Sequence, residues 1–141
     1  MVRAPIERCF ALVDAVERYP DWYPEVVREV SVVERDGEGH PSKAHTKLHV
    51  ARGPLVKDFD LLMNVAAERP AAVTLTRIRH GPSDQEQFEV RWRLGEEAAG
   101  TSVRLDVEAT LSVPRLVPVG GIGDAVAEGF VAAALKELMR A

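Results

Sequence analysis

The sequence predicts an α+β domain, in which a curved antiparallel sheet of six to seven strands wraps on a long C-terminal helix, with two short helices near the N-terminus. The apolar residues first recur with helical spacing, alternate in an extended pattern from residue 26 to 113, and then return to helical spacing. Every break in the extended part contains Gly or Pro, as hairpin turns do. No linker suggests a second domain, so we expect one domain over residues 1–141.

The first helix is expected from Pro5 to Val16. Its apolar residues recur at spacings of three and four and would share one buried face: Ile6, Cys9, Phe10 and Val13. Proline is well tolerated in a first helical turn, and Glu7 suits the positive end of the helix dipole. Cys9 is the one cysteine of the sequence, so no intrachain disulfide can form, and we interpret it as a small buried apolar residue.

Three aromatic rings and two prolines follow directly in the segment Glu17-Arg18-Tyr19-Pro20-Asp21-Trp22-Tyr23-Pro24, here called the Tyr-Pro corner. A residue before proline is pushed out of the α region, so Tyr19 and Tyr23 are not expected inside one continuous helix. We expect a sharp break, one tight turn and an exit into extended chain. Rigid rings at such a corner either fill a core or line the mouth of a cavity.

Six strands are expected in the extended region. Their ranges are 26–35, 43–51, 57–67, 72–79, 85–94 and 101–113. Alternation is clearest in the last two strands, and it predicts one dry and one wet face of the sheet. The dry face of the fifth strand comprises Phe88, Val90, Trp92 and Leu94.

The second strand carries two histidines opposite a mostly apolar set. The set expected to face inward is Ala44, Thr46, Leu48 and Val50. His45 and His49 then face water, and four residues of strand separate them by about 13 Å, too far for two ligands of one metal. No HExxH or CxxC pattern is present, so we expect neither a metal nor a cofactor.

A final helix is expected from Gly123 to Arg140. Its apolar stripe is Ala127, Phe130, Val131, Ala134, Leu135 and Leu138. A straight helix on a twisted sheet touches it well along its middle, and small residues beside the stripe would leave space there. These small residues are Ala125, Gly129, Ala132 and Ala133. We expect an apolar pocket on the scale of ~300–1,000 Å³, with a fully packed core as the alternative.

Charge and composition exclude several classes of protein. The net charge is −4, with 46% hydrophobic and 28% charged residues, which is ordinary for a globular domain. The acidic balance argues against nucleic acid as a partner, because phosphate binding needs clustered Lys and Arg. No apolar run reaches the ~18 residues of a membrane span, and residues 1–5 contain no hydrophobic signal segment. We therefore expect a cytoplasmic protein.

The order of elements resembles the START-like superfamily, also called SRPBCC, which has the helix-grip fold. Residues 4–10 resemble the entry into the first helix of that superfamily. Residues 16–24 resemble the "D-x-E-x-Y-P-x-W-x-P" turn of polyketide cyclase/dehydrase and coenzyme-Q-binding-type members. The resemblance covers nearly the whole chain. One departure is that members usually open with a full strand, whereas here only residues 1–3 precede Ala4.

The resemblance implies that a lipid-, quinone- or polyketide-like molecule binds between the sheet and the C-terminal helix. The ligand contacts that we expect are Trp22, Tyr23, Met63, Arg77, Phe88, Trp92 and Phe130. Two alternatives stay open, because one fold hosts several functions. One is a polyketide cyclase, aromatase or dehydratase, and the other is a protein-interaction module such as a ribosome-directed toxin.

Residues that could catalyse a reaction are few. If Leu75 faces inward, Arg77 does too, and a buried arginine would need an anionic or carbonyl partner. The candidates for acid–base chemistry are Arg77, Thr76 and Tyr23. Neither a GxSxG elbow nor a phosphate-binding loop is present. We expect a non-catalytic binder and, if the protein is an enzyme, a polyketide cyclase or dehydratase.

Overall fold

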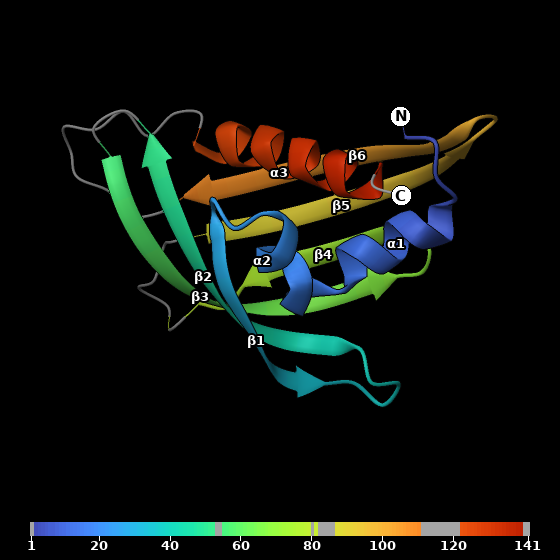
Figure 1. Ribbon diagram of the computed structural model, residues 1–141. Coiled ribbons are helices and arrows are strands. Elements are labelled where there is room, and N and C mark those ends of the chain that lie inside the picture. Colours follow the sequence, from blue (N-terminus) through green and yellow to red (C-terminus); the bar gives the residue numbers. More distant parts are fainter. Residues whose placement is uncertain (1, 53–54, 80, 82–86, 111–121, 140–141) are drawn as a thin grey trace.

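The computed structural model describes residues 2–52, 55–79, 81, 87–110 and 122–139. These residues form one antiparallel sheet of six strands in the order β1-β2-β3-β4-β5-β6, with helices packed on it (Figure 1). The helices are α1 (Ile6–Asp14), the 3-10 helix η1 (Val16–Arg18), α2 (Tyr19–Trp22) and α3 (Ile122–Leu138). The strands are β1 (Val27–Arg35), β2 (Pro41–Arg52), β3 (Leu55–Glu68), β4 (Ala72–Arg77), β5 (Gln87–Glu97) and β6 (Gly100–Thr110).

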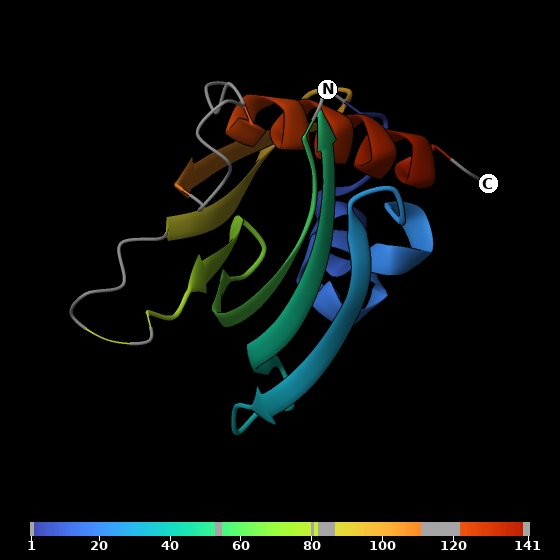
Figure 2. The ribbon, with the colours of Figure 1, turned by 90° about the vertical axis from the view of Figure 1, so that its left-hand side faces the viewer.

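The sheet is strongly curved, and α3 lies across it (Figure 2). Helix α3 packs mainly against β6, α1 contacts β4, β5 and β6, and α2 contacts β1. This arrangement confirms the α+β fold with a curved sheet and a long C-terminal helix. Strands β2 and β3 are longer than expected, because their pairing continues to Arg52 opposite Leu55. Strand β4 is shorter and ends at Arg77.

A single-residue bridge extends the sheet beyond β6. Val2 and Thr101 exchange two backbone hydrogen bonds, each of 2.9 Å, and Thr101 Oγ1 donates to the backbone oxygen of Ala4 at 2.7 Å. Gly100 permits this approach, because a Cβ atom there would overlap the backbone oxygen of Val2. The chain just before α1 is therefore fastened to the outer edge of β6.

The Tyr-Pro corner forms a short helix where the sequence suggested one tight turn. Tyr19 has φ −52° and ψ −40°, inside the α region, so the expectation that Pro20 pushes it out was wrong. Pro20 lies in the first turn of α2, where its missing N–H removes no intrahelical bond, and the restriction before proline is a preference. Tyr23 ends α2 with φ −137° and ψ 55°. No continuous helix contains both tyrosines, as predicted.

The concave face of the sheet is apolar. Buried side chains alternate along the strands, and the register aligns them, with Val73 opposite Trp92 and Leu75 opposite Val90. This face comprises Ala44, Leu48, Phe59, Leu61, Met63, Val65, Val73, Leu75, Phe88, Val90, Trp92 and Leu94. Helix α3 buries Phe130, Ala134 and Leu138 against it, and α1 buries Ile6, Cys9, Phe10 and Val13. The inward sets predicted for β5 and α1 are confirmed. Of the stripe predicted for α3, Phe130, Ala134 and Leu138 are buried, whereas Ala127, Val131 and Leu135 are half-buried.

The convex face of the sheet carries charged pairs. His49 Nδ1 lies 2.7 Å from Asp58 Oδ1, and His45 pairs with Asp60 on the same two strands. Both histidines therefore lie opposite the apolar set of β2, as the alternation predicts. Exposed pairs of this kind contribute at most about 1 kcal/mol each, so this face stabilises the sheet only weakly.

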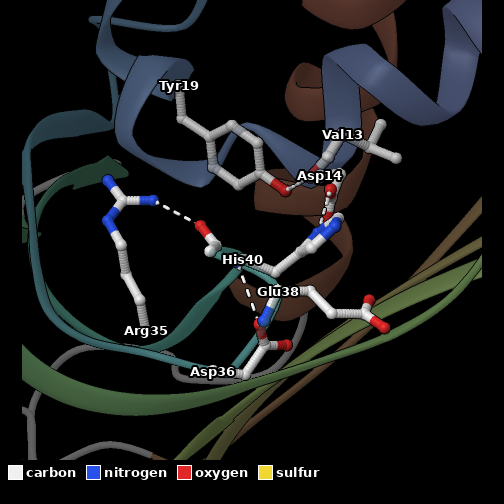
Figure 3. Close-up of polar contacts among 8 residues, drawn as sticks. Val13, Asp14, Tyr19, Arg35, Asp36, Glu38 and His40 are labelled. Carbon is white, nitrogen blue, oxygen red and sulfur yellow. Dashed lines mark hydrogen bonds and ion pairs between the residues drawn. The ribbon is translucent and has the colours of Figure 1, made fainter.

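Polar contacts fasten the β1–β2 hairpin to the end of α1 (Figure 3). His40 Nδ1 lies 3.0 Å from Asp14 Oδ2, so the hairpin turn reaches the last residue of the helix. Within the turn, Asp36 Oδ1 accepts hydrogen bonds from the backbone N–H groups of Glu38 and His40 at 2.9 and 3.0 Å. These two bonds lower the pKa of the Asp36 carboxyl group.

Candidate functional site

Five aromatic rings meet between α2, α3 and β5, and we call them the aromatic cluster. Phe130 lies at its centre, with ring centroids 5.1 Å from Tyr19, 5.3 Å from Trp22, 4.8 Å from Tyr23 and 5.0 Å from Trp92. All five side chains are buried. Four of them are expected ligand contacts, and Tyr19 was missed although it belongs to the Tyr-Pro corner. Tyr23 stacks on Phe130, Tyr19 and Trp92 meet Phe130 edge to face, as buried aromatic pairs prefer, and Trp22 is tilted by 40° from it.

Tyr23 fills the space that the small residues of α3 were expected to leave open. A Cβ atom at Gly129 would overlap the Tyr23 hydroxyl and would lie 3.2 Å from its Cζ atom. Ala132 is exposed, so its small side chain opens no interior volume either. The prediction of free space was therefore wrong at both positions. Tyr23, from the Tyr-Pro corner, occupies the space beside Gly129, and Ala132 faces solvent.

Burial changes the acidity of both tyrosines in the cluster. It raises the pKa of Tyr23 to about 12, and the negative charge of Glu25 adds to the shift. Burial raises the pKa of Tyr19 further, and the nearby Trp92 indole N–H lowers it in part. The Trp92 Nε1 atom has no hydrogen bond of normal geometry to any residue that the structure describes. The Tyr19 hydroxyl donates to the backbone oxygen of Val13. At neutral pH both phenols are protonated, so neither serves as a general base.

The register of β4 places Arg77 on the concave face. Arg77 lies opposite Met63 of β3 and two residues beyond the buried Leu75, and its side chain is half-buried. A hollow of about 180 Å³ at this end of the sheet is lined by residues of both faces, namely Thr76, Arg77, Arg79, Gln87, Phe88, Glu89 and Glu108. Thr76 is exposed and lies on the opposite face of the sheet from Leu75 and Arg77.

One buried polar side chain on the concave face was not singled out from the sequence. Thr46 of β2 is 5% exposed, and its Oγ1 finds no hydrogen-bond partner among the residues that the structure describes. The alternation of the second strand had placed Thr46 inward, between Ala44 and Leu48. That placement, with a hydroxyl in an apolar row, was the signal that could have identified it.

A cleft opens beside the Tyr-Pro corner, between α1, α2 and the end of α3. Its volume is about 350 Å³. The lining mixes apolar and charged side chains: Arg8, Ala11, Leu12, Ala15, Arg18, Asp21, Trp22, Glu137 and Leu138. Because Trp22 belongs to both the lining and the aromatic cluster, this cleft connects the surface with the edge of the apolar interior.

Other kinds of site are not formed by the residues described here. Across these ranges no three His, Cys, Asp or Glu side chains come together as a metal site requires. No helix in the same part of the chain is both long and apolar enough to cross a bilayer.

Solved structures of low sequence identity share this fold. A START superfamily protein from Mycobacterium smegmatis is 20% identical, with a TM-score of 0.73 over 97% of this chain and 91% of that one. The Zhui aromatase/cyclase from Streptomyces sp. R1128 is 17% identical, with a TM-score of 0.63 over 99% and 89% of the two chains. A STAR-related lipid transfer protein from Xanthomonas axonopodis is 14% identical, with a TM-score of 0.64 over 99% and 82%. No curated protein sequence matches the chain.

The curved sheet, the helix across it and the apolar concave face define a START-like protein with the helix-grip fold. The family model described as "Polyketide cyclase / dehydrase and lipid transport" matches residues 2–135, which is nearly the whole chain. The chain belongs to this family. The resemblance inferred from the Tyr-Pro corner and the order of elements is thereby confirmed.

Proposed function

We propose that this protein binds a small hydrophobic molecule between the concave face of its sheet and α3. The observation that carries the proposal is the continuous apolar wall from β2 to β5, against which the aromatic cluster packs. An apolar lining with a few polar groups is typical of small-molecule sites. The family description, which includes lipid transport, and the lipid transfer protein and aromatase/cyclase with the same fold agree with this proposal.

The proposed contact residues fall into two groups. The aromatic group contains Trp22, Tyr23, Trp92 and Phe130, and the wall group contains Met63, Arg77 and Phe88. Because Phe130 touches four other rings, a ligand that enters beside α3 must lie against Phe130 or displace it. Both tryptophans are within 6.4 Å of another ring of the cluster, so ligand entry should change their fluorescence.

Binding of an apolar probe tests the proposal. We expect 2-methylnaphthalene to bind the purified protein, measured by isothermal titration calorimetry and by tryptophan fluorescence. Phe130→Leu should weaken binding about tenfold, because an aromatic contact and part of the apolar area are lost. Val33→Ala, at an exposed position of β1, is the control and should bind like the wild type.

Two results would contradict parts of the proposal. Equal binding by Phe130→Leu and the wild type would remove Phe130 from the site. Absence of probe binding, together with no co-purifying molecule in native mass spectrometry of protein from cells, would reject ligand binding itself.

A polyketide cyclase, aromatase or dehydratase is the second candidate. The specific observation in its favour is Arg77 on the concave face, since a guanidinium group can stabilise an oxyanion. A guanidinium group has hydrogen-bond donors and no acceptor, and burial raises the pKa of Tyr23, so neither side chain supplies the base that an aldol step needs. This lack of a base among the named candidates favours binding or carriage over catalysis.

We also propose that residues 1–141 act as one ligand-binding domain in the cytoplasm. Support for one domain comes from the single apolar core, which includes side chains of α1, α2, α3 and the strands β1 to β5. The acidic net charge of −4 agrees with a partner that is a small molecule and not a nucleic acid.

A further inference from the structure

We propose that Thr46 is a hydrogen-bonding anchor that selects ligands carrying a hydroxyl or carbonyl oxygen over plain hydrocarbons. This inference rests on the proposed function and goes beyond it, because it assigns ligand selectivity to one side chain. Thr46 lies in the middle of β2, on the same face as Ala44 and Leu48. Its cross-strand partners are Val30 on β1 and Leu61 on β3. The hydroxyl is thus surrounded by apolar side chains on both neighbouring strands.

A buried hydroxyl without a partner is uncommon in folded proteins. Most buried polar side-chain atoms have a hydrogen-bond partner, and an exception calls for an explanation such as a ligand or a water. Valine has nearly the same shape as threonine and would avoid the desolvation of the hydroxyl. At Thr46 the protein therefore keeps a polar atom where an apolar one would favour the unliganded fold. Because the described residues offer this hydroxyl no partner, a bound ligand accounts for its retention.

The position of Thr46 relative to Arg77 indicates what such a partner would be. Met63 lies opposite both Ala44 and Arg77, and Thr46 is two residues from Ala44 along β2. The Cα atoms of Thr46 and Arg77 are two strands apart and offset by two residues along the strands, which separates them by roughly 12 Å. Both are polar points on one apolar wall. This face of the sheet therefore fits an apolar molecule whose oxygen atom lies over β2 at Thr46. The molecule need not also reach Arg77.

Two probes of equal shape test the role of the hydroxyl. 2-Naphthol and 2-methylnaphthalene differ in one group, a hydroxyl against a methyl, so their affinity ratio isolates the hydrogen bond. Thr46→Val should weaken 2-naphthol binding about fivefold to tenfold, the range expected for one neutral hydrogen bond, and leave 2-methylnaphthalene unchanged. Thr46→Ser keeps the hydroxyl and should keep the preference. Thr74→Val, on the opposite face of the sheet from Val73 and Leu75, should change neither affinity.

Thermal unfolding without ligand gives a second, independent readout. Thr46→Val should raise the melting temperature, because the desolvated hydroxyl is removed while the shape is kept. If Thr46 instead made a hydrogen bond within the folded chain, Thr46→Val would lower the melting temperature.

The outcomes separate this inference from the proposed function. If both probes bind and Thr46→Val leaves their affinity ratio unchanged, the anchor is wrong while ligand binding stands. A lower melting temperature of Thr46→Val would also overturn the anchor, since the hydroxyl would then have a partner within the folded chain. If neither probe binds the wild type, the proposed function fails and the anchor with it.

Discussion

Gly129 and Tyr23 show how one residue without a side chain sets the packing of a helix. The Tyr23 ring stacks on Phe130 at a centroid distance of 4.8 Å, and its hydroxyl end reaches the backbone of α3 at Gly129. In most exposed helical positions alanine is more favourable than glycine by about 1 kcal/mol. Here the lack of a Cβ atom lets a tyrosine from the Tyr-Pro corner lie directly against the helix.

Gly129→Ala should therefore destabilise the protein, against the usual preference for alanine in helices. Since Tyr23 must shift, we expect a loss of about 1–3 kcal/mol in the free energy of unfolding, measured by urea titration. Tyr23→Phe removes the atom closest to the added methyl group, so in that background the penalty of Gly129→Ala should shrink. A gain in stability in the wild-type background would show that the contact between α3 and Tyr23 is loose.

The residues of the site could be predicted to different extents. Alternation was sufficient for Phe88 and Trp92, because a strand with one dry face allows one register. It was insufficient for Arg77, because both faces of β4 carry polar residues, and only the pairing with Met63 decided the question. The alternation placed Thr46 inward, but only the three-dimensional structure shows that its hydroxyl has no hydrogen-bond partner among the described residues.

At the scale of elements, the β1–β2 hairpin depends on a contact that is distant in sequence. Pairing of β2 with β3 joins this hairpin to the sheet, and β1 also contacts α2 and η1. The pair of His40 with Asp14, with side chains 27% and 13% exposed, adds a link to the end of α1. Within the described ranges the second oxygen of Asp14 is buried without a hydrogen-bond partner, so His40 is an important partner of this carboxylate.

His40→Ala should lower the free energy of unfolding by about 1 kcal/mol, because the half-buried Asp14 carboxylate loses a hydrogen bond. Chemical denaturation followed by circular dichroism is the measurement. Lys43→Ala is the matched control in the same hairpin, since Lys43 pairs at 3.4 Å with the exposed Glu34 and should contribute nearly nothing. Equal effects of the two substitutions would contradict the link between hairpin and helix.

Most elements were predictable, because Gly and Pro mark their ends and the apolar period identifies their type. The clearest miss was α2, where the preference before Pro20 was applied as a strict rule. The backbone of Tyr19 stays helical, and its hydroxyl donates to Val13 in the preceding helix. Such a contact between neighbouring helices outweighs a local preference and is invisible in the local sequence.

At the scale of the whole molecule, the aromatic cluster joins the three parts of the fold. Tyr23 and Trp22 come from the corner, Phe130 from α3 and Trp92 from β5, so their packing connects the start, end and middle of the chain. The geometry of a helix on a twisted sheet predicted free space, but it did not predict that a ring from the corner would occupy part of it. A ligand must therefore compete with side chains that already pack together.

The stability of the molecule should fall as the pH rises above about 10, the pKa of tyrosine in an unfolded chain. Burial raises the pKa of Tyr23 to about 12 and that of Tyr19 further, so between these values the unfolded chain releases protons that the folded one keeps. Proton release then favours unfolding. Urea titrations at about pH 8 and about pH 11 would measure the fall.

Tyr23→Phe provides the comparison, because it removes one of the two shifted phenols. The variant should lose less stability than the wild type over the same rise in pH. Equal losses would show that Tyr23 does not contribute to the alkaline effect.

The bridge between Val2 and Thr101 covers part of an edge of the sheet. Strand β6 ends the sheet, and an uncovered end strand offers free main-chain N–H and C=O groups to any other strand. The two backbone hydrogen bonds of Val2 pair these groups of β6 at Thr101, next to Gly100. Removal of residues 1–3, or a bulky fusion before Ala4, would leave these groups unpaired. It would thus favour oligomers in which β6 pairs with a strand of another copy.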